Sequence, residues 1–246
     1  MMFQDKYCSL RYGDEQIQFK LKRKDLKASK IVILVQPDAS VIVTAPNSAG
    51  MGEIDAALIK RAKWISNKVA EFKSQEKHTL ERTYSSGESH FYLGRRYLLK
   101  VNIDDSHNEF IKLYRGQIHV NVKSYSSEKV KNLLLAWYKI KALEVFNTLL
   151  EELLKKTPWA TSKPKIKIKR MATQWGSCSP KGEILLNPHL IKANKTSIEY
   201  VLLHELCHLA EHNHSDRFYR LLEQVMPNWR DIKDNLDTKA TYYLNT

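Results

Sequence analysis

The chain has 246 residues, of which 43% are hydrophobic and 27% charged, and it contains only 8 glycines and 7 prolines. This composition excludes a disordered, collagenous or low-complexity chain and suits one large domain or two small ones. Three cysteines, Cys8, Cys178 and Cys207, are too few for a disulfide framework. The apolar runs are too short to span a bilayer, and the N-terminal residues lack an apolar signal region. We therefore expect a cytoplasmic protein that does not enter a membrane.

The net charge of +13 is unevenly distributed along the chain. Residues 1–200 contain 35 Lys and Arg against 20 Asp and Glu, whereas residues 201–246 contain 5 against 7. Such an excess favours encounter with acidic partners, nucleic acid included. The densest cluster alternates with apolar residues, which predicts a strand with a charged outer face: Lys163, Lys165, Lys167, Lys169 and Arg170. A solvated face is the simpler interpretation, and a strip that contacts phosphates is the alternative.

The first part of the chain is predicted to be rich in strands. Alternation of Ile17, Phe19 and Leu21 with polar residues predicts one strand, and a second covers the apolar run 31–35. Pro37-Asp38 predicts a turn into a further strand around 41–43. Apolar residues every three or four positions predict a helix over 51–72, and the polar stretch 73–90 is the best candidate linker. We therefore expect a β-rich N-terminal region with one helix over 1–85 and a second domain over 86–246.

Hairpin-like strands are predicted at 91–93, 97–101, 110–114 and 118–122, with turns at Gly94 and Gly116. A long helix is predicted over 127–156 with a buried stripe made of Leu133, Trp137, Ile140, Leu143, Phe146, Leu150 and Leu153. After the basic strand, a turn at Pro180 and Gly182 leads to a short strand over 183–187. Helices follow over 196–211 and 215–225, and a last one begins after Pro227. Strands and helices in this order indicate an α+β fold.

The chemically informative segment is His204-Glu205-Leu206-Cys207-His208. Thr196 and Glu199 form a capping-box pattern that predicts the start of its helix. Residues four apart on an α-helix project from the same face, so His204 and His208 can bind one zinc ion. Glu205 stands between them, within reach of a water molecule at the metal. The surrounding residues are apolar nearly all round the helix, which predicts that these polar groups are buried and need partners.

A catalytic zinc ion takes three protein ligands and keeps one position for water. Candidates for the third ligand are Glu211, His212 and His214, with Cys178 and His189 further upstream. His214 can reach the same ion only if the helix breaks near His212-Asn213, and Ser215 then caps a new helix. The spacing HExxHxxxxxH is that of metzincins, but Glu211 replaces their glycine. We predict His214 as the third ligand.

Several blocks of the sequence resemble the YgjP-like zinc metallopeptidases and, more distantly, the SprT-like proteases. The match is firmest over residues 170–230, in the blocks Trp175-Gly176-Ser177-Cys178-Ser179, Gly182, Leu186-Asn187, Tyr200-Val201, HELCH, Asn213-His214-Ser215 and Phe218. It continues weakly through Arg61, Trp64, Ile65, Gly87-Glu88 and Tyr92-Leu93-Gly94. Gln174 departs from the pattern, because the family commonly has arginine at this position.

The resemblance implies a zincin-type catalytic domain with one zinc ion per chain, held by His204, His208 and His214. Glu205 is then the general base of peptide-bond hydrolysis by a zinc-activated water molecule. The resemblance also implies that residues 183–187 form an edge strand for an extended peptide. Candidate residues for substrate binding are therefore Trp175, Glu183, Ile184 and Leu185. The oxyanion donor stays open among Trp175, His189, Tyr200 and Tyr219.

Two other functions remain possible at this stage. One is a deformylase-type amide hydrolase, in which Cys178 replaces His214 as the third zinc ligand. The other is a nucleic-acid-associated protein with a structural zinc ion, in which the basic N-terminal part contacts nucleic acid. The partner of the favoured function is a peptide or protein substrate.

Overall fold

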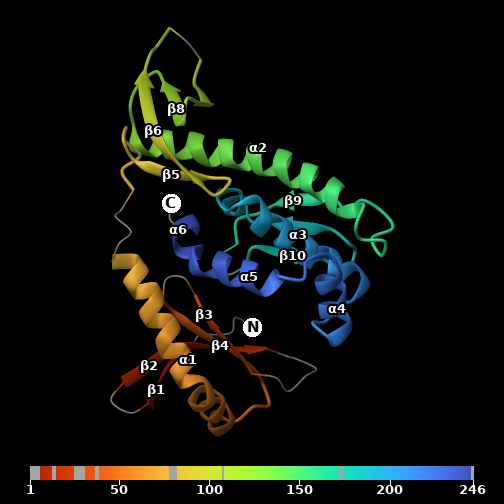
Figure 1. The fold of residues 1–246 in the computed structure, drawn as a ribbon. Coiled ribbons are helices and arrows are strands. Elements are labelled where there is room, and N and C mark those ends of the chain that lie inside the picture. The colour runs from red at the N-terminus through yellow and green to blue at the C-terminus, as the bar shows by residue number, and fades with distance from the viewer. Residues whose placement is uncertain are drawn as a thin grey trace. The chain divides into compact units, whose positions relative to one another are not determined.

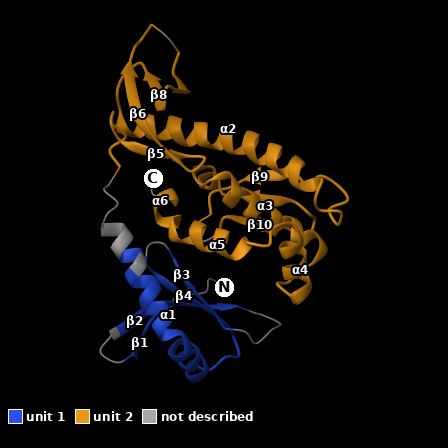
Figure 2. Cartoon of the chain, viewed as in Figure 1, with its two compact units in different colours: residues 1–80 blue, residues 81–246 orange. Residues whose placement is uncertain are grey.

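The computed structural model describes residues 6–12, 15–24, 31–36, 39–77, 82–106, 108–171 and 174–244. The chain divides into two compact units, Met1–Leu80 and Glu81–Thr246, which Figure 2 shows in blue and orange. The division comes slightly before the predicted boundary at residue 85. The predicted linker over 73–90 is too long, because a helix continues to Lys77 and a strand begins at Ser89. The predicted turn at Pro37-Asp38 lies outside the described residues.

The first unit is a four-stranded sheet covered on one face by a helix (Figure 1). Its strands are β1 (Lys6–Tyr12), β2 (Glu15–Lys24), β3 (Val32–Val35) and β4 (Val41–Pro46), in the order β1-β2-β4-β3. Helix α1 (Met51–Lys77) extends beyond the predicted end at residue 72. The alternating residues Ile17, Phe19 and Leu21 are buried, as is the helix face that includes Ile54 and Leu58. This unit therefore has its own hydrophobic core.

The second unit begins with a four-stranded sheet of order β5-β6-β8-β7. Its strands are β5 (Ser89–Tyr92), β6 (Arg95–Ile103), β7 (Phe110–Tyr114) and β8 (Gln117–Val122). The pairs β5–β6 and β7–β8 are hairpins, and β6 and β8 run parallel between them. Gly94 and Gly116 adopt positive φ angles of 78° and 75° in the two turns, a conformation that favours glycine. The predicted hairpins are thus present.

Helix α2 (Ser127–Leu154) packs against this sheet and against the following helical part (Figure 1). The predicted stripe is wrong at its centre, because Ile140 and Leu143 are 58% and 43% exposed. The buried residues are instead Val130, Leu134, Trp137, Tyr138, Ala142, Phe146, Leu149, Leu150 and Leu153. Three residues cover only about 300° of an α-helix, so the successive steps from Trp137 to Ile140 and Leu143 each turn back by about 60°, and the centre of the predicted stripe faces away from the core.

A small sheet and a group of helices complete the second unit. The sheet has the order β10-β11-β9, from β9 (Ile166–Ile168), β10 (Gly176–Cys178) and β11 (Ile184–Leu186). A 3₁₀ helix η1 (Pro188–Lys192) precedes α3 (Lys195–Ala210), α4 (Asp216–Val225), α5 (Trp229–Thr238) and α6 (Ala240–Leu244). The mixture of strands and helices confirms the α+β class. Among the described residues, no helix is long and apolar enough to cross a membrane.

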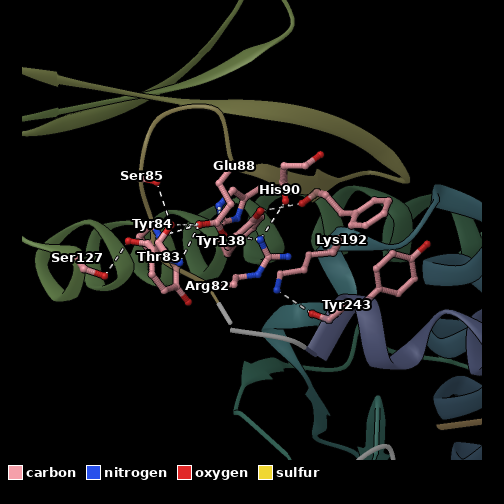
Figure 3. A network of polar contacts seen from close by, with 12 residues as sticks. Arg82, Thr83, Tyr84, Ser85, Glu88, His90, Ser127, Tyr138, Lys192 and Tyr243 are labelled. Carbon is pink, nitrogen blue, oxygen red and sulfur yellow. Dashed lines mark hydrogen bonds and ion pairs between the residues drawn. The ribbon is translucent and has the colours of Figure 1, made fainter. Parts of the chain in front are cut away.

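A buried polar network joins the start of the second unit to its helices (Figure 3). The Glu88 carboxylate pairs with Arg82 at 2.7 Å and accepts the backbone N–H of Tyr84 at 2.7 Å. Nε2 of His90 lies 3.2 Å from Glu88 Oε1, without the alignment of a hydrogen bond. Lys192 of η1 is also buried, and its Nζ donates to the Tyr243 carbonyl oxygen at 2.7 Å. The first contacts lie within residues 82–90, and the Lys192 bond joins η1 to α6.

Candidate metal centre

Helix α3 carries His204, Glu205 and His208 on a buried framework of apolar residues. The helix begins at Lys195, and its N-cap is Asn194, whose side-chain oxygen accepts the backbone N–H of Ser197 at 2.8 Å. The predicted capping box of Thr196 and Glu199 is therefore wrong. Asn194 is preferred because it has an extended backbone, with φ −68° and ψ 160°, so it can turn its side chain onto the first helical turn.

Three imidazoles meet at one end of α3. One ring nitrogen from each of His204, His208 and His214 lies within 4.8 Å of the corresponding nitrogens of the other two. Nε2 of His204 is 3.0 Å from Nε2 of His214. Burial, followed by the neighbouring His208 and His214, lowers the pKa of His204 to about 3, so this ring is neutral near pH 7. Among the described residues, this is the cluster of His, Cys, Asp and Glu that could hold a metal ion.

The end of α3 brings His214 back to the cluster. The helix stops at Ala210, and Glu211 adopts an extended conformation with φ −145° and ψ 104°. The break thus comes before the predicted His212-Asn213, and Asn213 is not among the residues with positive φ. Nδ1 of His208 lies 3.2 Å from the Glu211 carbonyl oxygen. When Nδ1 donates to this carbonyl, Nε2 is left with a free lone pair for a metal ion.

Helix α4 fixes the third imidazole from the other side. Ser215 is its N-cap, as predicted, and its hydroxyl accepts the backbone N–H of Phe218. The Phe218 side chain is fully buried, and its ring centroid lies 4.9, 4.8 and 4.7 Å from those of His204, His208 and His214. One aromatic ring therefore packs against all three imidazoles and restricts their orientations.

Glu205 is buried beside this cluster, with only 4% of its surface exposed. Its Oε2 has no hydrogen-bond partner among the described residues, and burial raises the pKa of the carboxyl group to about 8. A Cβ atom at Gly176 would lie 2.6 Å from Glu205 Oε1, which is closer than real contacts allow. The glycine therefore leaves the space that the carboxylate occupies.

The strand that lies against α3 is β10, not β11. The prediction that residues 183–187 form an edge strand is wrong, because β11 is paired on both sides, with β10 and with β9. A strand with both edges paired cannot accept a further strand. Ile184 is also fully buried, so its side chain is closed to a substrate. Glu183, just before β11, pairs with Lys167 at 2.7 Å.

The other predicted candidates lie outside the three-histidine cluster. Cys178, on β10, is not part of it, and burial followed by the charge of Glu205 raises the pKa of its thiol to about 11. His189 is buried in η1, and His212 is exposed next to the turn. The rings of Tyr200 and Tyr219 lie 6.1 and 6.3 Å from those of His204 and His214, respectively. Trp175 packs against the hydrophobic core of the unit.

Sequence reasoning assigned no role at the site to three residues that shape it. Phe218 and Gly176 were noted only as parts of the blocks that resemble the family. Asn187 is the third: its Nδ2 donates to the carbonyl oxygens of Met171 and Gln174, at 2.8 and 3.2 Å. These bonds hold the segment that leads into β10. The motif Trp-Gly-Ser-Cys and the pair Leu186-Asn187 were the available signals, but neither shows what its residues contact.

Comparison with known proteins identifies the family of the chain. The sequence model of the YgjP-like metallopeptidase domain matches residues 29–239, so the chain belongs to the YgjP-like family. The resemblance found in the sequence is thus confirmed, and the family is one of metallopeptidases. No curated protein matches the chain.

Two solved structures are similar over part of the chain, and both are described as metallopeptidase zymogens. Abylysin of Pyrococcus abyssi is 29% identical, covers 38% of this chain and 93% of its own, and has a TM-score of 0.35. Jannalysin of Methanocaldococcus jannaschii is 23% identical, covers 39% of this chain and 96% of its own, and also has a TM-score of 0.35.

Proposed function

We propose that the protein is a zinc-dependent peptidase in which His204, His208 and His214 hold one zinc ion per chain. The observation that carries this proposal is the convergence of three imidazole nitrogens within 4.8 Å beside a buried carboxylate. Three nitrogen ligands are a donor set that zinc uses in catalytic sites, where a fourth position stays open. The residues present therefore fit the metal that the family implies.

Glu205 is the proposed general base. Zinc, when bound, supplies a Lewis acid that polarises the scissile carbonyl group and makes water more acidic. Oε2 of Glu205 has no partner among the described residues. Burial raises the pKa of this carboxyl group, and the positive charge of a bound zinc ion would lower it again, so that the ionised form can accept the proton of the attacking water. Glu205 then passes this proton to the nitrogen of the leaving amine, and the C–N bond breaks. A carboxylate held by packing performs both transfers without reorganisation.

We propose that the substrate is an extended peptide that pairs with β10. On the side of β11, the Asn187 N–H donates to the Trp175 oxygen, and the Ser179 N–H donates to the Glu183 oxygen. Backbone groups of successive residues in a strand point to opposite edges, so those of Gly176 and Cys178 lie on the edge away from β11. Within the described part of the chain, β10 has no strand on that edge. Because β10 packs against α3, a peptide added there would run beside Glu205.

The experiment that tests this function is the substitution Glu205→Gln. The amide keeps the size of the side chain but cannot accept a proton, so we expect peptide hydrolysis to fall by about 10²–10⁴-fold. Zinc content, measured by elemental analysis, and the circular dichroism spectrum should be unchanged. Hydrolysis is measured by mass spectrometry on a peptide library derived from a proteome.

Glu199→Gln, on the same helix, is the matched control and should keep wild-type hydrolysis. Undiminished hydrolysis by Glu205→Gln would contradict the proposed base. Zinc binding without hydrolysis by the wild-type protein would contradict the peptidase assignment.

A further inference from the structure

The sheet β5-β6-β8-β7 has one face on the core, and within the described part of the second unit no other element packs on its opposite face. The inner face contributes Leu99, Ile118, Val120 and Val122 to the core beside α2. The strand registers place nine side chains in three rows on the opposite face. We call this the outer face. Its first row is Leu98, Gln117 and Tyr114, its second row is Lys100, His119 and Lys112, and its third row is Asn102, Asn121 and Phe110.

Contacts between side chains support this arrangement. The Asn102 amide donates to the Asn121 oxygen at 3.1 Å, across β6 and β8. The rings of Tyr114 and His119 lie 5.8 Å apart, across β7 and β8. Leu98, Tyr114 and Phe110 are 49%, 48% and 38% exposed, so apolar and aromatic side chains share this face with the polar ones. The outer face is therefore a continuous surface of polar, basic and aromatic groups.

The charged side chains of the outer face are all positive. It contains Lys100 and Lys112 and no carboxylate, and neither lysine forms an ion pair within the described part of the chain. The basic strand singled out in the sequence differs in this respect: Lys163 pairs with Glu151 at 2.6 Å, and Lys167 pairs with Glu183 at 2.7 Å. The stronger site for a polyanion is thus the outer face and not the run of residues 163–170.

Two aromatic rings of the outer face flank one of its cations, Lys112. Nζ of Lys112 lies 5.4 Å from the ring centroid of Phe110 and 5.5 Å from that of Tyr114. The guanidinium of Arg115, in the adjacent turn, lies 5.1 Å from the Tyr114 ring. These rings hold positive charge at the surface in the absence of a partner. When an anion draws the Lys112 ammonium group away from the two rings, Phe110 and Tyr114 become available for stacking.

We propose that the outer face binds single-stranded nucleic acid. The lysines would contact phosphates, Phe110 and Tyr114 would stack with bases, and the amides of Gln117, Asn102 and Asn121 would meet base edges. An acidic peptide would use the lysines but would leave the rings and amides without a matching group. The proposal does not depend on the peptidase function, since it uses none of the residues of the metal centre.

Fluorescence anisotropy of the full chain with labelled oligo-dT and oligo-U, over a series of salt concentrations, tests the proposal. We expect binding that weakens as salt increases. The double variant Lys100→Gln/Lys112→Gln should bind about tenfold more weakly at low salt, with a salt slope smaller by about 1.4, since each phosphate contact contributes about 0.7. The variant Phe110→Ala/Tyr114→Ala should also bind about tenfold more weakly but keep the wild-type salt slope.

The matched control is Lys165→Gln/Lys169→Gln, which removes the same charge from the basic strand and should keep wild-type affinity. Circular dichroism and melting temperature verify that each variant is folded. Three results would overturn the proposal: no salt-dependent binding by the wild type, an equal loss of affinity in the control, or equal competition by a polyglutamate peptide. The last result would indicate an acidic protein partner instead.

Discussion

The carboxylate of Glu205 occupies space that only a glycine at position 176 leaves open. A Cβ atom there would lie 2.6 Å from Oε1, 3.0 Å from Cγ and 3.1 Å from Cδ of Glu205. The atoms that would clash belong to a side chain, so the backbone of β10 and α3 can stay in place while the carboxylate moves. Gly176 thus acts as a positioning residue for the proposed base.

This contact predicts the effect of Gly176→Ala. We expect the protein to fold and to bind zinc as the wild type does, while kcat for peptide hydrolysis falls by at least about tenfold because the base is displaced. Steady-state kinetics and elemental analysis measure the two effects. Gly52→Ala is the control, since a Cβ atom there has nothing within 4 Å. Unchanged kcat in Gly176→Ala would show that Glu205 does not need its present position.

At this scale, the sequence predicted the residues that carry a recognisable spacing. His204 and His208 followed from the four-residue repeat of a helix, and His214 from the need for a third ligand. Gly176 and Asn187 could not be predicted, because their contacts join parts of the chain whose proximity depends on the whole fold. A single sequence gives no signal for which backbone a glycine or an asparagine will meet.

The beginning of α3 shows how an element positions the site. Asn194 caps the helix through Ser197, whereas the predicted cap, Thr196, is an exposed residue of the first turn. A cap at position 194 satisfies a backbone N–H that would otherwise lack a partner near the helix end.

We expect Asn194→Ala to lower the free energy of unfolding by about 1 kcal/mol, because the cap hydrogen bond is lost. Thr196→Ala should change it by less than about 0.5 kcal/mol, as is typical of exposed positions. Urea denaturation followed by circular dichroism measures both. Equal effects of the two substitutions would contradict the assignment of the cap.

Helices were predicted more successfully than strand order. The periodicity located α1 to α4 within a few residues, since it depends on local geometry. It did not reveal that β11 is the central strand, because β9 pairs with it in parallel from an earlier part of the chain. Strand neighbours are chosen by tertiary packing, and alternation within one strand contains no information about them.

On the scale of the whole molecule, the buried polar network of the second unit makes stability depend on pH. Burial, followed by the positive charge of Arg82, lowers the pKa of His90 to about 3; Glu88 opposes this shift and Lys192 adds to it. The unfolded chain takes up this proton near the ordinary pKa of about 6.5, whereas the folded protein does not. The contribution of His90 is therefore fully present above pH 6.5 and is lost as the pH falls towards 3.

We expect the free energy of unfolding of the second unit to fall by about 2 kcal/mol between pH 7.5 and pH 5 through His90 alone. Tryptophan fluorescence in urea reports on this unit, which contains four of the five tryptophans. His90→Gln should reduce the pH dependence by about that amount. His212→Gln, which removes an exposed imidazole, should leave it unchanged, and a variant at residue 90 with the full pH dependence would contradict the prediction.

The two units have separate hydrophobic cores, and the proposed zinc ligands all belong to the second. A ligand stabilises only the structure that binds it, by about 4 kcal/mol at a thousandfold excess over its dissociation constant. We therefore expect calorimetry to show two thermal transitions, of which zinc raises one. Removal of zinc with a chelator should lower the same transition, and equal shifts of both would contradict independent cores.

The separation of the two hydrophobic cores affects which substitutions the protein can accumulate during evolution. The three histidines that meet in the second unit all lie outside residues 17–72 of the first core, so we expect substitutions in that core to act mainly on the folding of the first unit. Among relatives, conservative substitutions in the first core should accordingly be tolerated more widely than substitutions beside the three histidines.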